Sequence, residues 1–97
     1  MTTKPTIPSS EYYDDVRSRL HALVDTCGPW FRPNEVAVLN DLVEANESGV
    51  ALEMLSEMLP EADAMLDGQT LLELTDLAKQ MGLDPAVRER LAKLSRA

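Results

Sequence analysis

The segment from Pro33 to Ala78 contains no lysine, arginine or histidine. The whole chain of 97 residues has one cysteine and one histidine, and aromatic side chains are scarce. A single cysteine excludes an internal disulfide and a cysteine-based metal cluster. No run of about 18 apolar residues is present, which excludes a transmembrane helix. The first residues lack the apolar region of a secretory signal, so we expect a cytoplasmic protein.

The same base-free segment holds most of the negative charge. Residues 1–32 carry four acids and four bases, and residues 79–97 carry five bases and two acids. The central segment carries eleven carboxylates, and the chain as a whole has a net charge of −8. Nucleic acids and anionic membranes require clustered lysine and arginine, so neither is an expected direct ligand. A strongly acidic surface favours a cationic partner.

Apolar residues recur at helical spacing throughout the chain, and no segment alternates with period two. The predicted fold class is therefore all-α, a compact bundle of four to five short helices. We expect a flexible tail over residues 1–8 and a single helical domain over residues 9–97. The first predicted helix begins at Ser9 or Ser10 and ends at Cys27. Four further helices are predicted over about residues 33–46, 50–59, 69–81 and 85–96.

Capping residues set the expected helix boundaries. Ser48 is a candidate cap for the third helix, and Pro60 is expected to stop it. Asp67 is a candidate N-cap for the fourth helix, and Gly82 suits the left-handed position that follows it. Asp84, with proline after it, is a candidate N-cap for the last helix.

The largest side chains are expected in the core. Trp30 and Phe31 are predicted to close one end of the bundle, with an exposed aromatic hot spot as the alternative. Leu72 belongs to the apolar stripe predicted for the fourth helix. Met54 and Met58 fit core filling, although methionine also provides soft surface that adapts to a partner.

The sequence offers little for catalysis. His21 is predicted to be a surface histidine, and Cys27 a small core or turn residue. The segment from Asp63 to Leu74 superficially resembles a calcium loop, but Met65 and Leu74 stand where oxygen ligands are needed. We therefore predict no catalytic, cofactor or metal site, and a protein that is not an enzyme.

The central carboxylates recur three or four residues apart, so we expect them on the exposed faces of helices. Like charges three or four residues apart destabilise an isolated helix slightly, and here no base offsets them over more than forty residues. This pattern predicts a surface for a basic protein partner. The candidate partner-binding residues are Glu44, Glu47, Glu53, Glu57, Glu61 and Asp63.

The chain resembles a bacterial family at residues 47–55, which read Glu-Ser-Gly-Val-Ala-Leu-Glu-Met-Leu. Residues 59–63 (Leu-Pro-Glu-Ala-Asp) and 81–84 (Met-Gly-Leu-Asp) extend the likeness over about residues 36–84. The family is that of the small helical immunity proteins of polymorphic toxin systems, of the MafI type and their contact-dependent-inhibition relatives. The resemblance implies a cognate secreted toxin domain, often a nuclease, that this protein neutralises by stoichiometric binding. Gly49 would then supply the tight break between two helices.

Two other functions are compatible with the same features. One is a cytoplasmic helical adaptor or regulatory module, which could dimerise through its third helix. The other is an acidic DNA mimic that inhibits a nucleic-acid-binding protein. A neighbouring gene for a toxin domain would favour the immunity protein over both.

Overall fold

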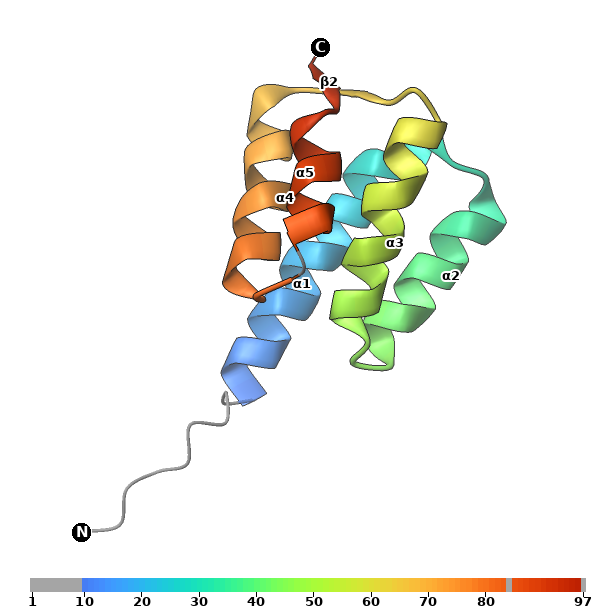
Figure 1. The fold of residues 1–97 in the computed structure, drawn as a ribbon. Coiled ribbons are helices and arrows are strands. Elements are labelled where there is room, and N and C mark those ends of the chain that lie inside the picture. Colours follow the sequence, from blue (N-terminus) through green and yellow to red (C-terminus); the bar gives the residue numbers. More distant parts are fainter. Residues whose placement is uncertain (1–9, 84, 97) are drawn as a thin grey trace, which may run out of the picture.

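A computed structural model describes residues 10–83 and 85–96. Five α-helices lie within this part of the chain (Figure 1). The expected tail and the candidate caps Ser9 and Asp84 lie outside the described residues. The elements in chain order are α1 (Ser10–Cys27), the 3-10 turn η1 (Gly28–Trp30), α2 (Pro33–Glu44), α3 (Ser48–Glu61), β1 (Met65–Leu66), α4 (Gly68–Gln80), α5 (Pro85–Ala92) and β2 (Ser95–Arg96).

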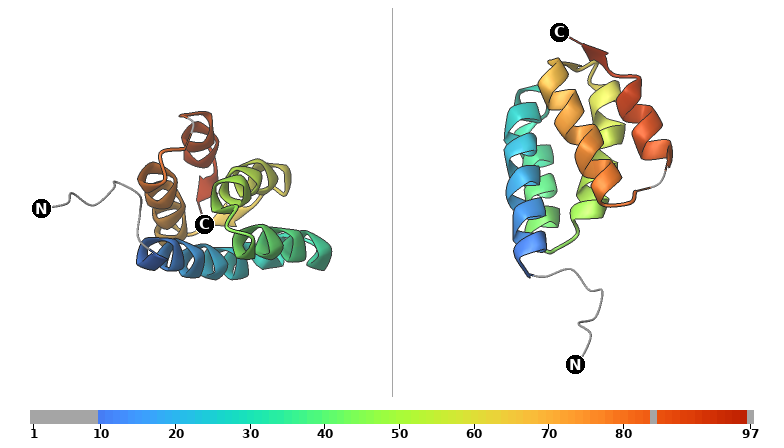
Figure 2. Two further views of the ribbon diagram at one scale, coloured as in Figure 1. Left: turned by 90° about the horizontal axis from the view of Figure 1, so that it is seen from below. Right: turned by 90° about the vertical axis from the view of Figure 1, so that its left-hand side faces the viewer.

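The helices form a ring when the bundle is viewed along its length (Figure 2). α1 packs on α2, α2 on α3, α3 on α5, and α5 on α4, which returns to α1. The hairpin of α2 and α3 and the helix α4 therefore lie on different sides of the molecule. This arrangement decides which surface residues share a face.

The five helices confirm the predicted all-α class, and they pack around one hydrophobic core. It is one cluster made almost entirely of leucine, valine and alanine, and leucines from α1, α2, α3 and α4 are wholly inaccessible to solvent. Cys27 lies in this cluster, as predicted. Burying each such leucine contributes about 1.5–3 kcal/mol, so the interdigitated stripes of the five helices stabilise the bundle.

Two local predictions at helix ends are confirmed. Asp67 caps α4 by accepting a hydrogen bond of 2.7 Å from the backbone N–H of Thr70. This contact lowers the pKa of Asp67, because the donor stabilises the charged carboxylate. Gly82 follows α4 with a φ of +65°, in the left-handed region that glycine adopts without a steric penalty.

The boundaries of α3 differ from the prediction. Pro60 lies inside the helix rather than ending it. Near the end of the helix, the proline removes only one backbone hydrogen bond, and its fixed φ is still compatible with the last helical turn. Ser48 is the first helical residue, with no side-chain cap at the preceding position. The break before α3 is made by Asn46, which has a φ of +61°, whereas Gly49 lies within the helix.

A short parallel pairing that the sequence did not predict joins β1 to β2. Met65 pairs with Ser95 and Leu66 with Arg96, so the last described residues are held against the link between α3 and α4. Two-residue strands carry too little alternation to be read from sequence. The pairing closes the α4–α5 hairpin at one end of the bundle (Figure 1).

Some apolar residues expected in the core are exposed. Trp30 is 40% exposed and Phe31 is only partly buried, so the prediction that they close the core is wrong for Trp30. Leucines already fill the interior, and the short turn η1 carries Trp30 at the edge of the bundle. Leu72 is 55% exposed, because it lies on the outer side of α4.

Candidate partner-binding surface

The six candidate carboxylates all lie on the α2–α3 hairpin or directly beside it. Glu44 ends α2, Glu47 lies in the turn, and the next three belong to α3. Asp63 follows α3 in a left-handed conformation. All six residues are exposed. The structure therefore brings them to one hairpin, although not to one narrow patch.

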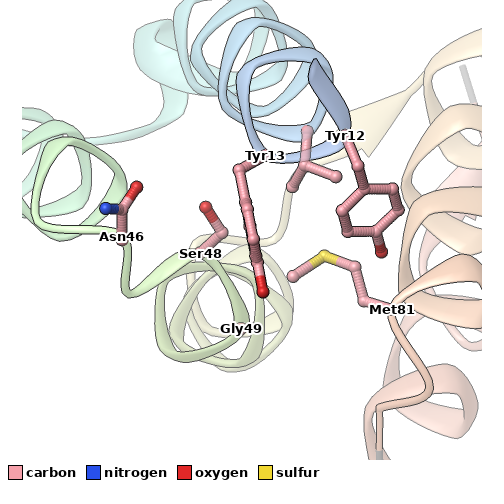
Figure 3. A pocket seen from close by; sticks show the side chains of 7 residues that line it. Tyr12, Tyr13, Asn46, Ser48, Gly49 and Met81 are labelled. Carbon is pink, nitrogen blue, oxygen red and sulfur yellow. The ribbon is translucent and has the colours of Figure 1, made fainter. Parts of the chain in front are cut away.

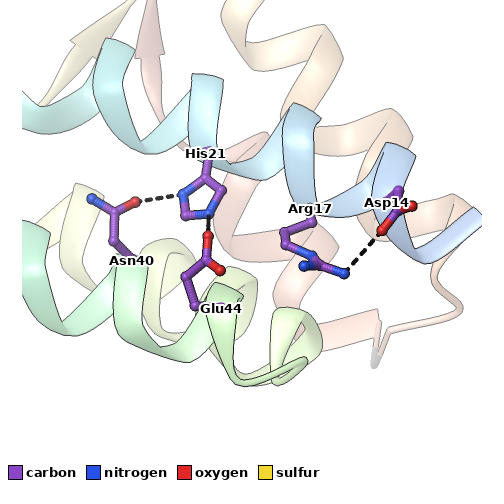
Figure 4. Close-up of polar contacts among 5 residues, drawn as sticks. All are labelled: Asp14, Arg17, His21, Asn40 and Glu44. Carbon is purple, nitrogen blue, oxygen red and sulfur yellow. Dashed lines mark hydrogen bonds and ion pairs between the residues drawn. The ribbon is translucent and has the colours of Figure 1, made fainter. Parts of the chain in front are cut away.

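Glu44 is held at the junction of α1 and α2 by His21 (Figure 4). Nε2 of His21 lies 2.6 Å from Oε1 of Glu44, and Nδ1 lies 2.8 Å from Oδ1 of Asn40. His21 is thus a partly exposed histidine that bridges two helices; the sequence predicted its place near the surface but not its two partners.

Glu57 is paired at the junction of α3 and α5. Its carboxylate lies 3.5 Å from a guanidinium nitrogen of Arg90. The same guanidinium donates to the hydroxyl of Ser56, which is buried and donates in turn to the carbonyl of Glu53. The Glu57 side chain is 55% exposed, so solvent screens this pair and its contribution to stability is small.

The other candidates have no internal counter-charge. Within the described residues, the side chains of Glu47, Glu53, Glu61 and Asp63 form no hydrogen bond or ion pair, and neither does that of Asp41 on α2. Sequence spacing alone had missed the partners of Glu44 and Glu57, because those partners come from α1 and α5. The hairpin therefore keeps a net negative face with a base at each lateral edge.

An apolar groove runs between the outer sides of α2 and α3. A hollow of about 220 Å³ is lined by Val38 from α2 and by Met54 and Met58 from α3, together with Asn34 and Glu35. Val38 is 48% exposed, and the two methionines pack partly against the core. The exposure of Val38 could not be predicted from the sequence, since helical spacing alone does not show where neighbouring helices leave a gap.

A second hollow of about 470 Å³ adjoins the first at the end of the bundle near η1. It is lined by Trp30 and Phe31, by Arg32, and by Glu61 from the end of α3. Glu35 and Met58 line both hollows, so the two lie side by side. The exposure of Trp30 agrees with the alternative prediction for this aromatic pair, an exposed hot spot for a partner, since interface hot spots are enriched in tryptophan.

Two further hollows lie elsewhere on the bundle. One of about 300 Å³ is formed by Tyr12, Tyr13 and Met81 against the turn between α2 and α3 (Figure 3). The other, about 450 Å³, lies between α4 and α5 beside Leu72. Neither hollow gathers several carboxylates, so neither continues the acidic face.

Cys27 is the one cysteine of the chain and lies in the core. Burial, together with the nearby negative charge of Asp67, raises the pKa of Cys27 to about 11, so the thiol stays protonated at neutral pH. The described residues include no group of three histidine, cysteine or acidic side chains placed to hold a metal ion. Among the described helices, none is both long and apolar enough to cross a membrane.

No family model, curated protein or solved structure matches this chain.

Proposed function

We propose that this protein is a binding module that covers the cationic surface of a partner protein. The observation that carries the proposal is the α2–α3 hairpin, which has no lysine or arginine and displays Glu47, Glu53 and Glu61 without internal counter-charges. Such a surface raises the association rate with a basic protein by about 10–10³-fold through long-range attraction. The partner supplies the positive charge that the hairpin lacks.

The sequence resemblance gives this partner a biological identity. It implies a toxin domain that the module neutralises by stoichiometric binding, as an immunity protein does. A nuclease is the expected toxin class, because an active site that binds phosphates is itself basic. An acidic helical surface complements such a site in charge, and it contains no phosphodiester bond that a nuclease could cleave.

The proposal is tested with the C-terminal domain encoded by the reading frame immediately upstream. We expect the two proteins to co-purify as a stoichiometric complex and the module to abolish the toxicity of that domain in cells. The charge reversal Glu53→Lys with Glu61→Lys should weaken both effects. A wild-type protein that neither binds nor protects would contradict the proposal, and a stable dimer in its place would favour the adaptor.

A further inference from the structure

The two adjoining hollows form one groove, here called the α2–α3 groove. Its lining residues are Trp30, Glu35, Val38, Met54, Met58 and Glu61. The groove extends from the η1 end of the bundle along the seam between α2 and α3. It combines an exposed aromatic side chain, flexible thioethers and carboxylates, which are the features of a surface that receives another protein segment.

The geometry of the groove fits a helix. Met54 and Met58 are one turn apart on α3, and Val38 faces them from α2. Two packed helices leave a furrow along their seam into which the side-chain ridge of a third helix can pack. The backbone groups of α2 and α3 are bonded within their own helices, so an extended segment would find no edge to pair with.

The charges along the groove select a cationic helix. Glu35 and Glu61 line the groove, and Asp41 is exposed on α2. Arg32 is the one base that lines either hollow in the described part of the chain. Carboxylates beside an apolar floor complement a helix that has an apolar stripe flanked by lysine or arginine.

We propose that the α2–α3 groove binds a cationic amphipathic helix of the partner protein. The inference rests on the proposed function and adds the class of element that the partner presents. Apolar side chains at positions i, i+4 and i+7 of that helix contact Val38, Met54 and Met58, and its basic side chains contact the flanking carboxylates. Trp30 covers one end of the bound helix.

Synthetic peptides provide the probe. The first peptide spans about four turns and places leucine along one helical face with lysine elsewhere. The second has the same composition arranged with period two. Binding is followed by the fluorescence of Trp30, the only tryptophan of the protein. We expect the helical peptide to bind and to shift the emission to shorter wavelength, and the period-two peptide to bind at least about tenfold more weakly.

Three variants, each checked for folding by circular dichroism, locate the bound peptide. The groove variant is Met54→Gln with Met58→Gln. The rim variant is Glu53→Lys with Glu61→Lys, in which Glu61 lines the groove and Glu53 is exposed two turns before it on α3. Leu72→Gln is the control, because Leu72 is an exposed apolar residue on α4 that does not line the groove. We expect affinity for the helical peptide to fall by about tenfold or more in the groove and rim variants and to remain unchanged in the control.

The inference is overturned if the groove variant binds like wild type, if Leu72→Gln weakens binding as much, or if both peptides bind equally. If the rim variant still loses affinity in those cases, the proposed function stands and only the groove is wrong. If the rim variant also binds like wild type, the acidic face itself is excluded as a binding surface.

Discussion

The α2–α3 and α4–α5 hairpins bury the same kind of core but carry different surfaces. Leu55 in the first and Leu77 in the second are both fully buried. Outside, the first hairpin has no lysine or arginine, whereas the second carries Lys79, Arg88 and Arg90 among its acids. Since one fold accommodates both surfaces, packing does not require the one-sided charge of α2–α3. That charge points to an interaction outside the chain.

The largest expected effect tests the similarity of the two cores. Leu55→Ala and Leu77→Ala should each lower the free energy of unfolding by about 2–5 kcal/mol, because each leaves a cavity at a buried site. Urea denaturation of each variant measures the loss. A loss below about 1 kcal/mol for either variant would place that residue outside a tightly packed core.

Charge reversal tests the difference between the surfaces. Glu53→Lys with Glu61→Lys should slow association with the proposed basic partner by about tenfold or more at low ionic strength, since it removes long-range attraction. The matched control Glu73→Lys with Asp76→Lys makes the same change in net charge on α4 and should have a smaller effect. Stopped-flow measurements at low and high salt separate the two. Equal slowing would show that only net charge matters.

A smaller effect is expected at Asp67, where the α4–α5 hairpin begins. Hydrogen bonding to Thr70 lowers the pKa of Asp67 in the folded protein below its ordinary value of 3.8. The stabilisation is therefore complete above that ordinary value and is lost as the pH falls through the lower folded pKa. We expect Asp67→Ala to lower the melting temperature at neutral pH and to differ little from wild type in strong acid. A difference that does not depend on pH would assign the loss to something other than the charged cap.

The smallest expected effect concerns the edge of the α2–α3 hairpin. Glu44→Gln should cost less than about 1 kcal/mol, because the Glu44 carboxylate is largely solvated despite its contact with His21. Asp41→Asn is the control, since the Asp41 side chain has no partner in the described residues. Urea denaturation at low and high salt measures both. A loss of several kcal/mol at Glu44 would make the bridge to α1 a main support of the hairpin.

Features set by residues close in sequence were predictable. The helices followed from apolar spacing, and the cap at Asp67 and the turn at Gly82 followed from the identities of single residues. Features that depend on neighbouring helices could not be predicted from the sequence. The pairing of Glu57 with Arg90 joins residues far apart in the chain, and the exposure of Leu72 depends on where α5 lies.

The candidate site was predictable only in part. The carboxylates of the α2–α3 hairpin could be named from sequence, because helical spacing and the lack of bases are visible there. The groove beside these carboxylates could not be predicted from the sequence, since it exists only where two helices pack and leave space between them. The size of its side chain predicts that Trp30 lies in the core, but leucines fill the interior and Trp30 is exposed.

The sulfur atoms of the described residues lie in two environments. Met54, Met58, Met65 and Met81 all reach the surface at least in part, whereas Cys27 does not. Peroxide converts exposed methionine to a polar sulfoxide, and methionine sulfoxide reductases reverse the change. Oxidative stress would therefore alter the α2–α3 groove while leaving the thiol in the core untouched, so the redox history of a sample becomes a variable in any measurement of its affinity.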